Sequence, residues 1–351
     1  MTVSGPESDD RIDVGRERLT VLFNALYDAG EATIPVEHPG EDLGELCRVQ
    51  LEDAGRCTIE FTCPADDYAD RRSTVASTYG EPAITEVPSG RSFVNAFVAG
   101  GVLDVANREE VDSFLDRYGS PDLTAGHRPV VAGFDTNLLP WRIADALEVT
   151  PGQDGAINGY ALATGVRDEL VWGQKRKDTR SLVEAFGDPF AELWNQPRGP
   201  SREGRLGEDY YRWLRDLRFA EEVPTETGDD EIVDGYDAFQ GESRKDVLLF
   251  SNDRDFVERA RSHRVLAQRV SFPDELPATV TVPWTTARDT LYVLTVLFGV
   301  LEVPKTTLYG VWRGKGGTAW HEERLRLDCR SPKLTPAIER DLRIVEAYEG
   351  L

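Results

Sequence analysis

The sequence predicts an α/β protein in which a parallel sheet flanked by helices lies between an α+β N-terminal region and an α+β C-terminal extension. Two short apolar runs support this prediction, Val130 to Phe134 and Val247 to Phe250, and each is long enough for one strand. Continuous apolar strands are buried on both faces, as the strands of parallel sheets are. Helical segments separate the strands along the chain, as expected for a parallel sheet.

Length and composition favour more than one domain. The chain has 351 residues and 40% hydrophobic content, which is enough for separate cores. We expect an α+β domain over residues 1–125, a central α/β domain over 126–277 with a helical insertion at about 174–222, and a C-terminal helix and hairpin extension over 278–351.

The chain is strongly acidic, with 40 Lys and Arg against 63 Asp and Glu and a net charge of −23. Only six of the 40 basic residues are Lys, and the chain has one Met. An acidic, Lys-poor surface is typical of cytoplasmic proteins from high-salt cells, where salt screens the self-repulsion. We therefore expect a halophilic, cytoplasmic protein. Net charge does not exclude RNA as a partner, because a local Arg-rich groove could still bind it.

Cysteine and histidine spacing predicts neither a metal site nor a disulfide framework. The four cysteines, at positions 47, 57, 63 and 329, are not paired in spacing, and the four histidines form no cluster. Cys57 and Cys63 alternate with polar residues, so we expect both on the inner face of a strand. No apolar run reaches the roughly 18 residues of a membrane span, and the first ten residues lack a targeting pattern. We expect no membrane partner.

In the N-terminal region we expect mainly helices, because apolar residues recur at intervals of three and four, as in Leu19, Leu22 and Leu26 before Gly30. Residues 1–16 are polar and are expected to be frayed. The predicted helices span residues 18–29, 43–51, 66–77 and 109–118, with one strand at 57–63. No motif here indicates chemistry, so this region is expected to contact a partner or RNA, or to support the central domain.

The central domain is expected to alternate strands and helices after the strand at Val130. The predicted helices span residues 140–148, 229–240 and 255–262, with another starting near Gly165. The predicted strands span 247–250 and 265–270, and a weaker element is expected at about 157–163. Beyond this domain we expect a buried helix over 286–303, a hairpin of 308–312 with 323–327, and a terminal helix over 336–348. The hairpin turn, Arg313 to Gly317, is either a structural turn or a phosphate contact.

Acidic residues follow the predicted strands and begin the predicted helices. Asp135 and Asp253 follow the two buried strands, and Glu169 and Asp230 lie at helix starts. In parallel sheets ligands collect at the carboxyl ends of the strands. Carboxylates that converge there raise one another's pKa unless cations bind, and such oxygen ligands suit Mg²⁺ or Mn²⁺. The chemistry indicated is hydrolysis of a phosphodiester, in which the metal lowers the pKa of a bound water.

Four segments resemble the acidic motifs of PIN-domain ribonucleases: GFDTNLL from Gly133, Glu169 placed 34 residues after Asp135, DDEIV from Asp229, and LLFSNDRDF from Leu248. The resemblance covers residues 128–273, under half of the chain. It implies a PIN-like fold and a Mg²⁺- or Mn²⁺-dependent ribonuclease. It also implies four catalytic acids, which are Asp135, Glu169, Asp230 and Asp253.

The resemblance implies further roles. The metal ligands are Asp135, Asp230 and Asp253, with Asp255 assisting and with Asp234 as a rival third acid. Asp234 is a rival because the spacing from Asp230 to Asp253 is longer than the pattern expects. Asn137 and Asn252 are expected to orient the carboxylates or to contact phosphate. Lys175 and Arg176, in the densest basic cluster of the chain, are either phosphate contacts or part of a solvated helix face.

Each acid also has a structural interpretation. Asp135 and Asp253 fit turn or N-cap positions, Glu169 fits a surface acid, and Asp230 fits a helix N-terminus whose dipole favours negative charge. The functional alternatives are an inactive PIN-like module that binds RNA or a protein partner, a homo-oligomer included, and a DNA or flap nuclease. A phosphatase that forms an aspartyl-phosphate is disfavoured, because Asn137 stands where that chemistry needs a second Asp.

Overall fold

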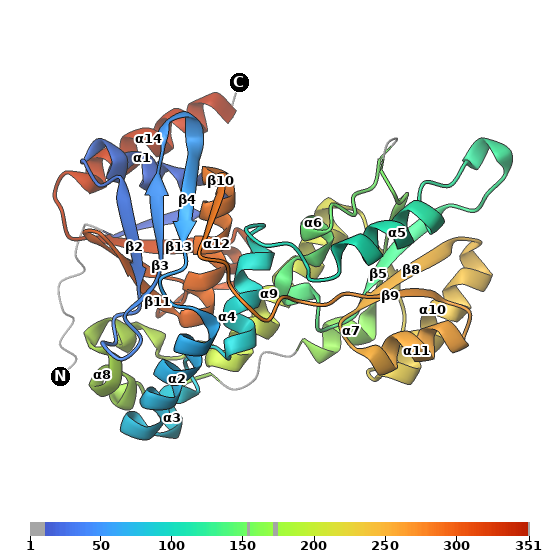
Figure 1. The fold of residues 1–351 in the computed structure, drawn as a ribbon, viewed down its shortest axis with the longest axis horizontal. Helices are drawn as coiled ribbons and strands as arrows, with labels where there is room; N and C mark the ends of the chain where they lie inside the picture. Colours follow the sequence, from blue (N-terminus) through green and yellow to red (C-terminus); the bar gives the residue numbers. More distant parts are fainter. Residues whose placement is uncertain (1–10, 153–154, 171–174, 350–351) are drawn as a thin grey trace. The chain divides into compact units, whose positions relative to one another are not determined.

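The computed structural model describes residues 11–152, 155–170 and 175–349. It divides into two compact units: unit 1 comprises Met1–Phe93, Gln174–Pro200 and Glu275–Leu351, and unit 2 comprises Val94–Gly173 and Ser201–Asp274. Figure 1 colours the chain by sequence, and it shows blue and orange-red segments side by side in one sheet. The boundaries expected after residues 125 and 277 are therefore corrected. The first and last regions share a sheet, and residues 94–125 belong with the central domain.

Unit 1 contains an eight-stranded sheet in the order β1-β13-β12-β11-β2-β3-β4-β10, and every neighbouring pair is antiparallel. The strands are β1 (Arg11–Gly15), β2 (Thr33–Glu37), β3 (Glu45–Leu51), β4 (Arg56–Glu60), β10 (Thr279–Pro283), β11 (Val300–Val303), β12 (Thr306–Tyr309) and β13 (Arg324–Cys329). β1 pairs with β13, β2 with β11 and β4 with β10, so the sheet is completed only by strands from both ends of the described chain.

Two predictions for unit 1 are wrong. Residues 43–51 were expected to be helical, but Glu45–Leu51 is strand β3, because Cys47, Val49 and Leu51 bury alternate side chains. The chain before residue 16 was expected to be frayed, but Arg11–Gly15 is strand β1 and pairs with β13. Cys57 is buried in β4 as expected, whereas Cys63 is buried but lies three residues after β4 ends; both are free thiols.

The helices of unit 1 are α1 (Thr20–Asp28), α2 (Ala65–Tyr79), α3 (Glu81–Ile84), α8 (Arg180–Phe186), α12 (Trp284–Phe298), α13 (Gly317–His321) and α14 (Leu334–Glu349), and α4 (Gly90–Ala99) begins in it. α12 packs against β4, β10, β11 and β12, and it is buried from Thr290 to Phe298. It ends earlier than the expected Val303, because Gly299 adopts a φ of 81° and Val300–Val303 returns as β11. In the described ranges no helix is long and apolar enough to cross a bilayer.

Unit 2 contains a five-stranded sheet in the order β7-β6-β5-β8-β9, and every neighbouring pair is parallel. The strands are β5 (Val130–Phe134), β6 (Gly159–Ala163), β7 (Glu221–Val223), β8 (Asp246–Ser251) and β9 (Leu266–Arg269). The five residues of β5 are all buried, and β5 pairs with β8 from Val130 opposite Asp246 to Phe134 opposite Phe250. The predicted parallel sheet flanked by helices is confirmed.

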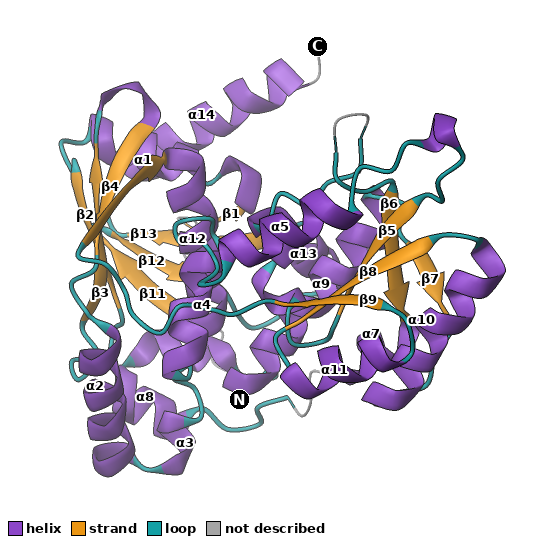
Figure 2. Ribbon diagram, turned by 45° about the vertical axis from the view of Figure 1, so that its right-hand side comes forward, coloured by secondary structure: helices purple, strands orange, loops and turns teal. Residues whose placement is uncertain are grey.

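The helices of unit 2 are α5 (Arg108–Tyr118), α6 (Ile143–Ala146), α7 (Thr164–Glu169), α9 (Gly199–Leu217), α10 (Asp229–Ser243) and α11 (Arg254–Ser262). Figure 2 shows α5 on one side of β8 and β9 and α11 on the other. The insertion expected at 174–222 is not one element. Residues 174–200 belong to unit 1, whereas α9 buries Tyr211 and Leu214 in the core of unit 2.

Candidate functional site

The sheet of unit 2 reverses its direction of growth at β5. β6 and β7 follow β5 on one side, and β8 and β9 follow on the other. In sheets of this kind ligands bind outside the carboxyl ends of the strands, at the point of reversal. Asp135 directly follows β5, and Asp253 lies two residues after β8. The topology therefore brings the two best sequence candidates to the expected position.

Asp135 is a buried carboxylate held by neutral donors. Only 5% of the residue is exposed. Its Oδ1 accepts from the Thr136 backbone N–H at 2.7 Å, and its Oδ2 accepts from Asn137 Nδ2 at 2.8 Å and from Ser251 Oγ at 2.5 Å. Burial raises the pKa of Asp135 to about 6, although the hydrogen bonds from Ser251 and Thr136 act to lower it. The negative charges of Asp229 and Glu169 raise it further.

Ser251 and Asn137 connect the ends of β5 and β8. The Ser251 side chain is fully buried, and its Oγ also accepts from the Asp253 backbone N–H at 2.9 Å. Asn137 Oδ1 accepts from the Asn252 N–H at 3.2 Å, and Asn252 Nδ2 donates to the Val270 carbonyl at 2.7 Å. Asn137 therefore contacts the Asp135 carboxylate, whereas the side-chain amide of Asn252 contacts the Val270 carbonyl instead. Sequence reasoning missed Ser251, whose position at the end of a buried strand was the available signal.

Asp253 is the N-cap of α11. Its Oδ1 accepts from the backbone N–H groups of Asp255 at 2.7 Å and Phe256 at 3.4 Å, so the structural interpretation of this residue holds. Asp253 is exposed at the same edge of the sheet as Asp135, and its charge raises the pKa of Asp229. Asp255 lies in the first turn of α11 and is exposed.

Glu169 joins three segments at the site. The Thr136 hydroxyl donates to Glu169 Oε2, and the Gly228 N–H donates to Oε1 at 2.8 Å. Glu169 ends α7, Thr136 follows β5, and Gly228 precedes α10 with a φ of 109°. The second acid expected from the sequence is therefore in the site, and it is held by Thr136, which sequence reasoning did not identify.

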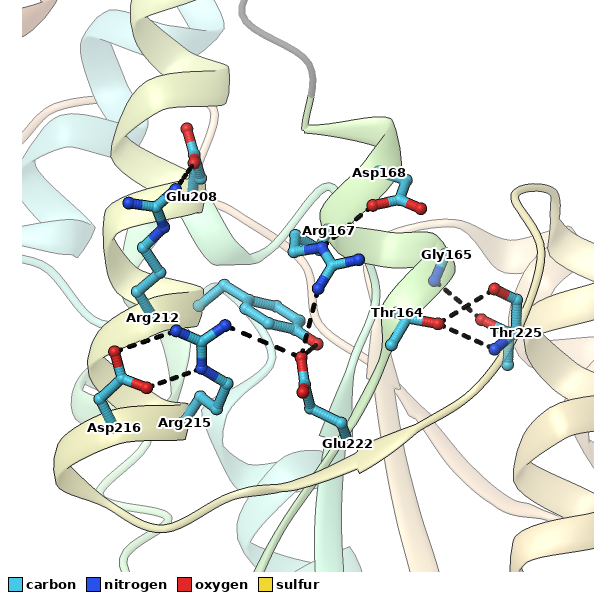
Figure 3. Close-up of polar contacts among 11 residues, drawn as sticks. Thr164, Gly165, Arg167, Asp168, Glu208, Arg212, Arg215, Asp216, Glu222 and Thr225 are labelled. Atoms are coloured by element: carbon cyan, nitrogen blue, oxygen red, sulfur yellow. Dashed lines mark hydrogen bonds and ion pairs between the residues drawn. The ribbon is translucent and has the colours of Figure 1, made fainter. Parts of the chain in front are cut away.

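The start of α7 is fixed by the loop that follows β7, as Figure 3 shows. The Thr225 N–H donates to Thr164 Oγ1 at 2.9 Å, and the Gly165 N–H donates to Thr225 Oγ1 at 2.8 Å. A Cβ at Gly165 would lie 2.0 Å from the Glu226 carbonyl oxygen, so only glycine fits. Further along α7, Arg167 Nη1 donates to Glu222 at 3.4 Å. These contacts fix the helix that carries Glu169.

Asp229, rather than Asp230, faces the other acids from α10. Arg259 pairs with both, through Nη1 to Asp229 at 3.3 Å and through Nε to Asp230 at 2.9 Å. The Asp230 side chain is 73% exposed. Burial and the charges of Asp253, Glu169 and Asp230 raise the pKa of Asp229, while Arg259 lowers it. The rival acid Asp234 pairs with His263 Nδ1 at 3.1 Å.

The two basic candidates lie in unit 1, whereas the acids lie in unit 2. Arg176 is buried and forms an ion pair with Glu86, so its guanidinium is not available to a phosphate in solution. Lys175 is exposed. In the glycine-rich turn, Lys315 is buried and donates to the carbonyls of Gly310 at 2.7 Å and Arg324 at 2.8 Å. This turn is therefore structural.

The site has the chemistry of a divalent-cation site but not its geometry. Carboxylate oxygens from four segments are the ligands that Mg²⁺ and Mn²⁺ prefer. Within the described ranges, however, no three His, Cys, Asp or Glu side chains form a group that could hold a metal ion. Both oxygens of Asp135 already accept hydrogen bonds, and Asp253 caps a helix. Metal binding would require at least one carboxylate to turn.

Comparison of the chain with known proteins does not assign it to a family. No protein-family model, curated protein or solved structure matches the chain. The likeness to PIN-domain motifs therefore stays a prediction.

Proposed function

We propose that unit 2 is a PIN-like nuclease domain that hydrolyses RNA phosphodiester bonds at the carboxyl ends of β5 and β8. The observation that carries the proposal is the convergence of Asp135, Glu169, Asp229 and Asp253 at one edge of the sheet. Among the described residues only Arg259 forms an ion pair with any of the four, through Asp229. Acids gathered with so little compensating charge, one of them buried with a raised pKa, are typical of functional sites.

The side chains of the site have separate roles in this proposal. Ser251 and Asn137 hold the Asp135 carboxylate in one orientation, and Thr136 and the Gly228 N–H hold Glu169. Asp229 takes the place of Asp230 as the acid from α10. A Mg²⁺ or Mn²⁺ ion, when bound, would lower the pKa of an attacking water and offset the negative charge of the phosphate.

The test is cleavage of a mixed RNA pool by the full chain in high salt with Mn²⁺. Asp135→Asn is expected to reduce cleavage at least roughly a hundredfold, as the loss of a group that acts on the reacting atoms commonly does. Asp234→Asn is the matched control, because Asp234 is an exposed acid paired with His263. Equal cleavage by wild type and Asp135→Asn would overturn the proposal. A parallel comparison of RNA with DNA of the same sequence separates a ribonuclease from a DNA or flap nuclease.

A binding module without catalysis is the second candidate. Two observations favour it: no three acids of the described residues form a group that could hold a metal ion, and Asp253 caps a helix. This candidate predicts RNA binding with no cleavage, no Mn²⁺ binding by calorimetry, and equal affinity in wild type and Asp135→Asn. Mn²⁺ binding that disappears in Asp135→Asn would count against it.

A further inference from the structure

A groove follows the outer edge of β9 in unit 2, between α5 and α11. Its larger part has a volume of about 720 Å³ and is lined by Arg254, Arg261 and Arg269, among others. An adjoining hollow of about 420 Å³ shares Arg261 and is also lined by Arg264 and Tyr118. We call the two parts together the β9 groove.

One end of the β9 groove adjoins the candidate site. Arg269 Nε donates to the Asn252 carbonyl at 3.2 Å, and Arg254 directly follows Asp253. Because β9 is parallel to β8, Arg269 lies at the carboxyl edge of the sheet, where the acids are. Arg264 precedes β9 and therefore lies toward the opposite edge. The groove leads from the acids along the edge strand.

Three arginines of the β9 groove have no carboxylate partner in the described part of the chain. The Arg261 guanidinium donates only to the Ala267 carbonyl, at 2.9 and 3.1 Å, and Arg269 donates to the Asn252 carbonyl. Arg264 is exposed, in a left-handed conformation with a φ of 64°. Arginines without a carboxylate partner are unexpected in a chain that has 63 Asp and Glu residues but only 40 Lys and Arg residues. A guanidinium without a carboxylate is suited to bind phosphate oxygens through two N–H groups.

The edge of β9 is closed to a further strand. The Ala267 carbonyl accepts from Arg261, and the Arg269 carbonyl accepts from Asn107 Nδ2 at 2.8 Å. An extended peptide that adds to a sheet edge needs such carbonyls for its own N–H groups. The occupant of the groove must therefore be recognised by side chains. Charge and aromatic surface are what these side chains offer.

Aromatic surface and charge occur together at the far end of the groove. Tyr118, in the last turn of α5, is partly exposed, and the Arg117 guanidinium lies 5.2 Å from its ring centroid. The hollow that contains Tyr118 and Arg264 has no acidic residue in its lining. Grooves that bind single-stranded nucleic acid combine positive charge along the backbone with aromatic rings on which bases stack.

Glutamates lie at the end of the groove that adjoins the site. Glu109, Glu110 and Glu258 line its larger part. Glu258 accepts from Arg254 at 2.9 Å, and Glu110 accepts from Asn107 Nδ2 at 3.3 Å. Their charges oppose a polyanion, so neutralising Glu109 should tighten the binding of one.

We propose that the β9 groove binds a single-stranded segment of the RNA, with Arg261, Arg264 and Arg269 on its phosphates and Tyr118 stacked on a base. This inference rests on the proposed function, because the groove would hold the RNA strand that the acids cut.

The test is binding of a fluorescent single-stranded RNA to the full chain carrying Asp135→Asn, so that cleavage does not interfere. Anisotropy is measured over a salt series in which circular dichroism shows the chain folded. Arg264→Glu is compared with Arg244→Glu, because both arginines are exposed, left-handed and without an ion pair in the described residues. Only Arg264 lines the groove.

Arg264→Glu is expected to weaken binding at least about fivefold and to reduce the slope of log affinity against log salt by about 0.7 for one lost phosphate contact. Tyr118→Ala is expected to weaken binding roughly tenfold through lost stacking. Arg244→Glu should leave affinity within about twofold, and Glu109→Gln should tighten binding.

Four outcomes would overturn the inference: no binding at the lowest salt tested, equal losses of affinity in Arg264→Glu and Arg244→Glu, no loss of affinity in Tyr118→Ala, or displacement of the RNA by polyglutamate as readily as by unlabelled RNA.

Cleavage by the wild type separates this inference from the proposed function. If the wild type cuts RNA and Arg264→Glu cuts it with an unchanged KM, the nuclease stands and the groove is wrong. If RNA binds in the groove and is never cut, the groove stands and the nuclease is wrong.

Discussion

The buried carboxylates Glu86 in unit 1 and Asp135 in unit 2 are held in opposite ways. In unit 1, Glu86 pairs with Arg176 in the interior, and Arg16 pairs with Glu323 at 2.6 Å. In unit 2, Asp135 is buried to a similar degree, yet its hydrogen bonds come from neutral donors and its charged neighbours are acids. Buried charge is paired where it supports the fold and left unpaired where acids meet at the sheet edge. Such local conflicts with stability are expected at functional sites.

The largest effect on stability is expected in unit 1. Glu86→Gln leaves the Arg176 charge buried without a carboxylate, and it should lower the free energy of unfolding by about 3 kcal/mol. Urea denaturation of the full chain measures this change. RNA cleavage per folded molecule should be unchanged, since Glu86 is not in the unit that contains the acids. A loss below about 1 kcal/mol would show that the pair does not support the fold.

The opposite sign is expected for Asp135→Asn. The pKa of Asp135 is raised to about 6 in the folded chain, against about 3.9 for an ordinary Asp. The folded state therefore binds the proton more tightly. Its stability is highest below the unfolded pKa and falls as pH rises through the folded pKa, by about 3 kcal/mol at most. Asp135→Asn should thus be more stable than wild type at pH 8.

Urea denaturation across pH is the measurement for Asp135→Asn. The stability gap between variant and wild type should widen from about pH 4 to about pH 6 and stay constant above that. A gap that does not change with pH would contradict the raised pKa of Asp135. This result would also remove the contrast between Asp135 and Glu86.

A smaller effect is expected for Ser251→Ala. It removes the hydroxyl that donates to Asp135 and accepts from the Asp253 N–H, and it should cost about 1–2 kcal/mol. Because that hydrogen bond lowers the pKa of Asp135, its loss should raise this pKa. As the pH is lowered, RNA cleavage by Ser251→Ala should therefore be lost at a higher pH than cleavage by the wild type. Ser262→Ala is the control, since among the residues that the structure describes its hydroxyl donates only to the Arg259 carbonyl. A pH profile unchanged in Ser251→Ala would exclude control of Asp135 by Ser251.

The smallest effect on stability is expected for Asp230→Asn. Its ion pair with Arg259 is exposed, so the free energy of unfolding should change by less than about 0.5 kcal/mol. Asp229→Asn should reduce RNA cleavage more than Asp230→Asn does, because Asp229 faces the other acids. Initial rates for the two variants decide this. The reverse order would return the third acid to Asp230, as the sequence motif implies.

The parallel sheet could be predicted because its strands are recognisable within short stretches. β5 and β8 are continuous apolar runs, and no neighbour is needed to identify them. The antiparallel sheet is different. β1 is a short segment that contains Arg11 and Asp13, and it becomes a strand through its pairing with β13, more than 300 residues away along the chain. Residues 45–51 contain apolar residues at both helical and strand spacing, and the pairing of β3 with β2 and β4 selects the strand.

From the sequence, the acids of the site could be predicted only where they follow a strand that the sequence itself reveals. Asp135 and Asp253 follow recognisable strands, whereas Glu169 ends α7 instead of beginning a helix as expected. Asp229 and Asp230 are adjacent on α10, and their difference depends on the helix start after Gly228 and on Arg259 from α11. No local pattern contains that information. In the same way, the sequence does not reveal that Arg176 is paired, because its partner Glu86 lies 90 residues earlier in the chain.

Because translation runs from the N-terminus, the strands of the shared sheet in unit 1 are synthesised in two stages. Translation produces β1 to β4 first, then all five strands of unit 2, and only afterwards β10 to β13. Until then the nascent β2-β3-β4 segment lacks the partners of its two outer strands, β11 beside β2 and β10 beside β4. Unpaired strand edges promote aggregation, and chains emerge at roughly 5–20 residues per second. The time that the ribosome needs to translate the residues between β4 and β11 therefore sets how long these edges stay open.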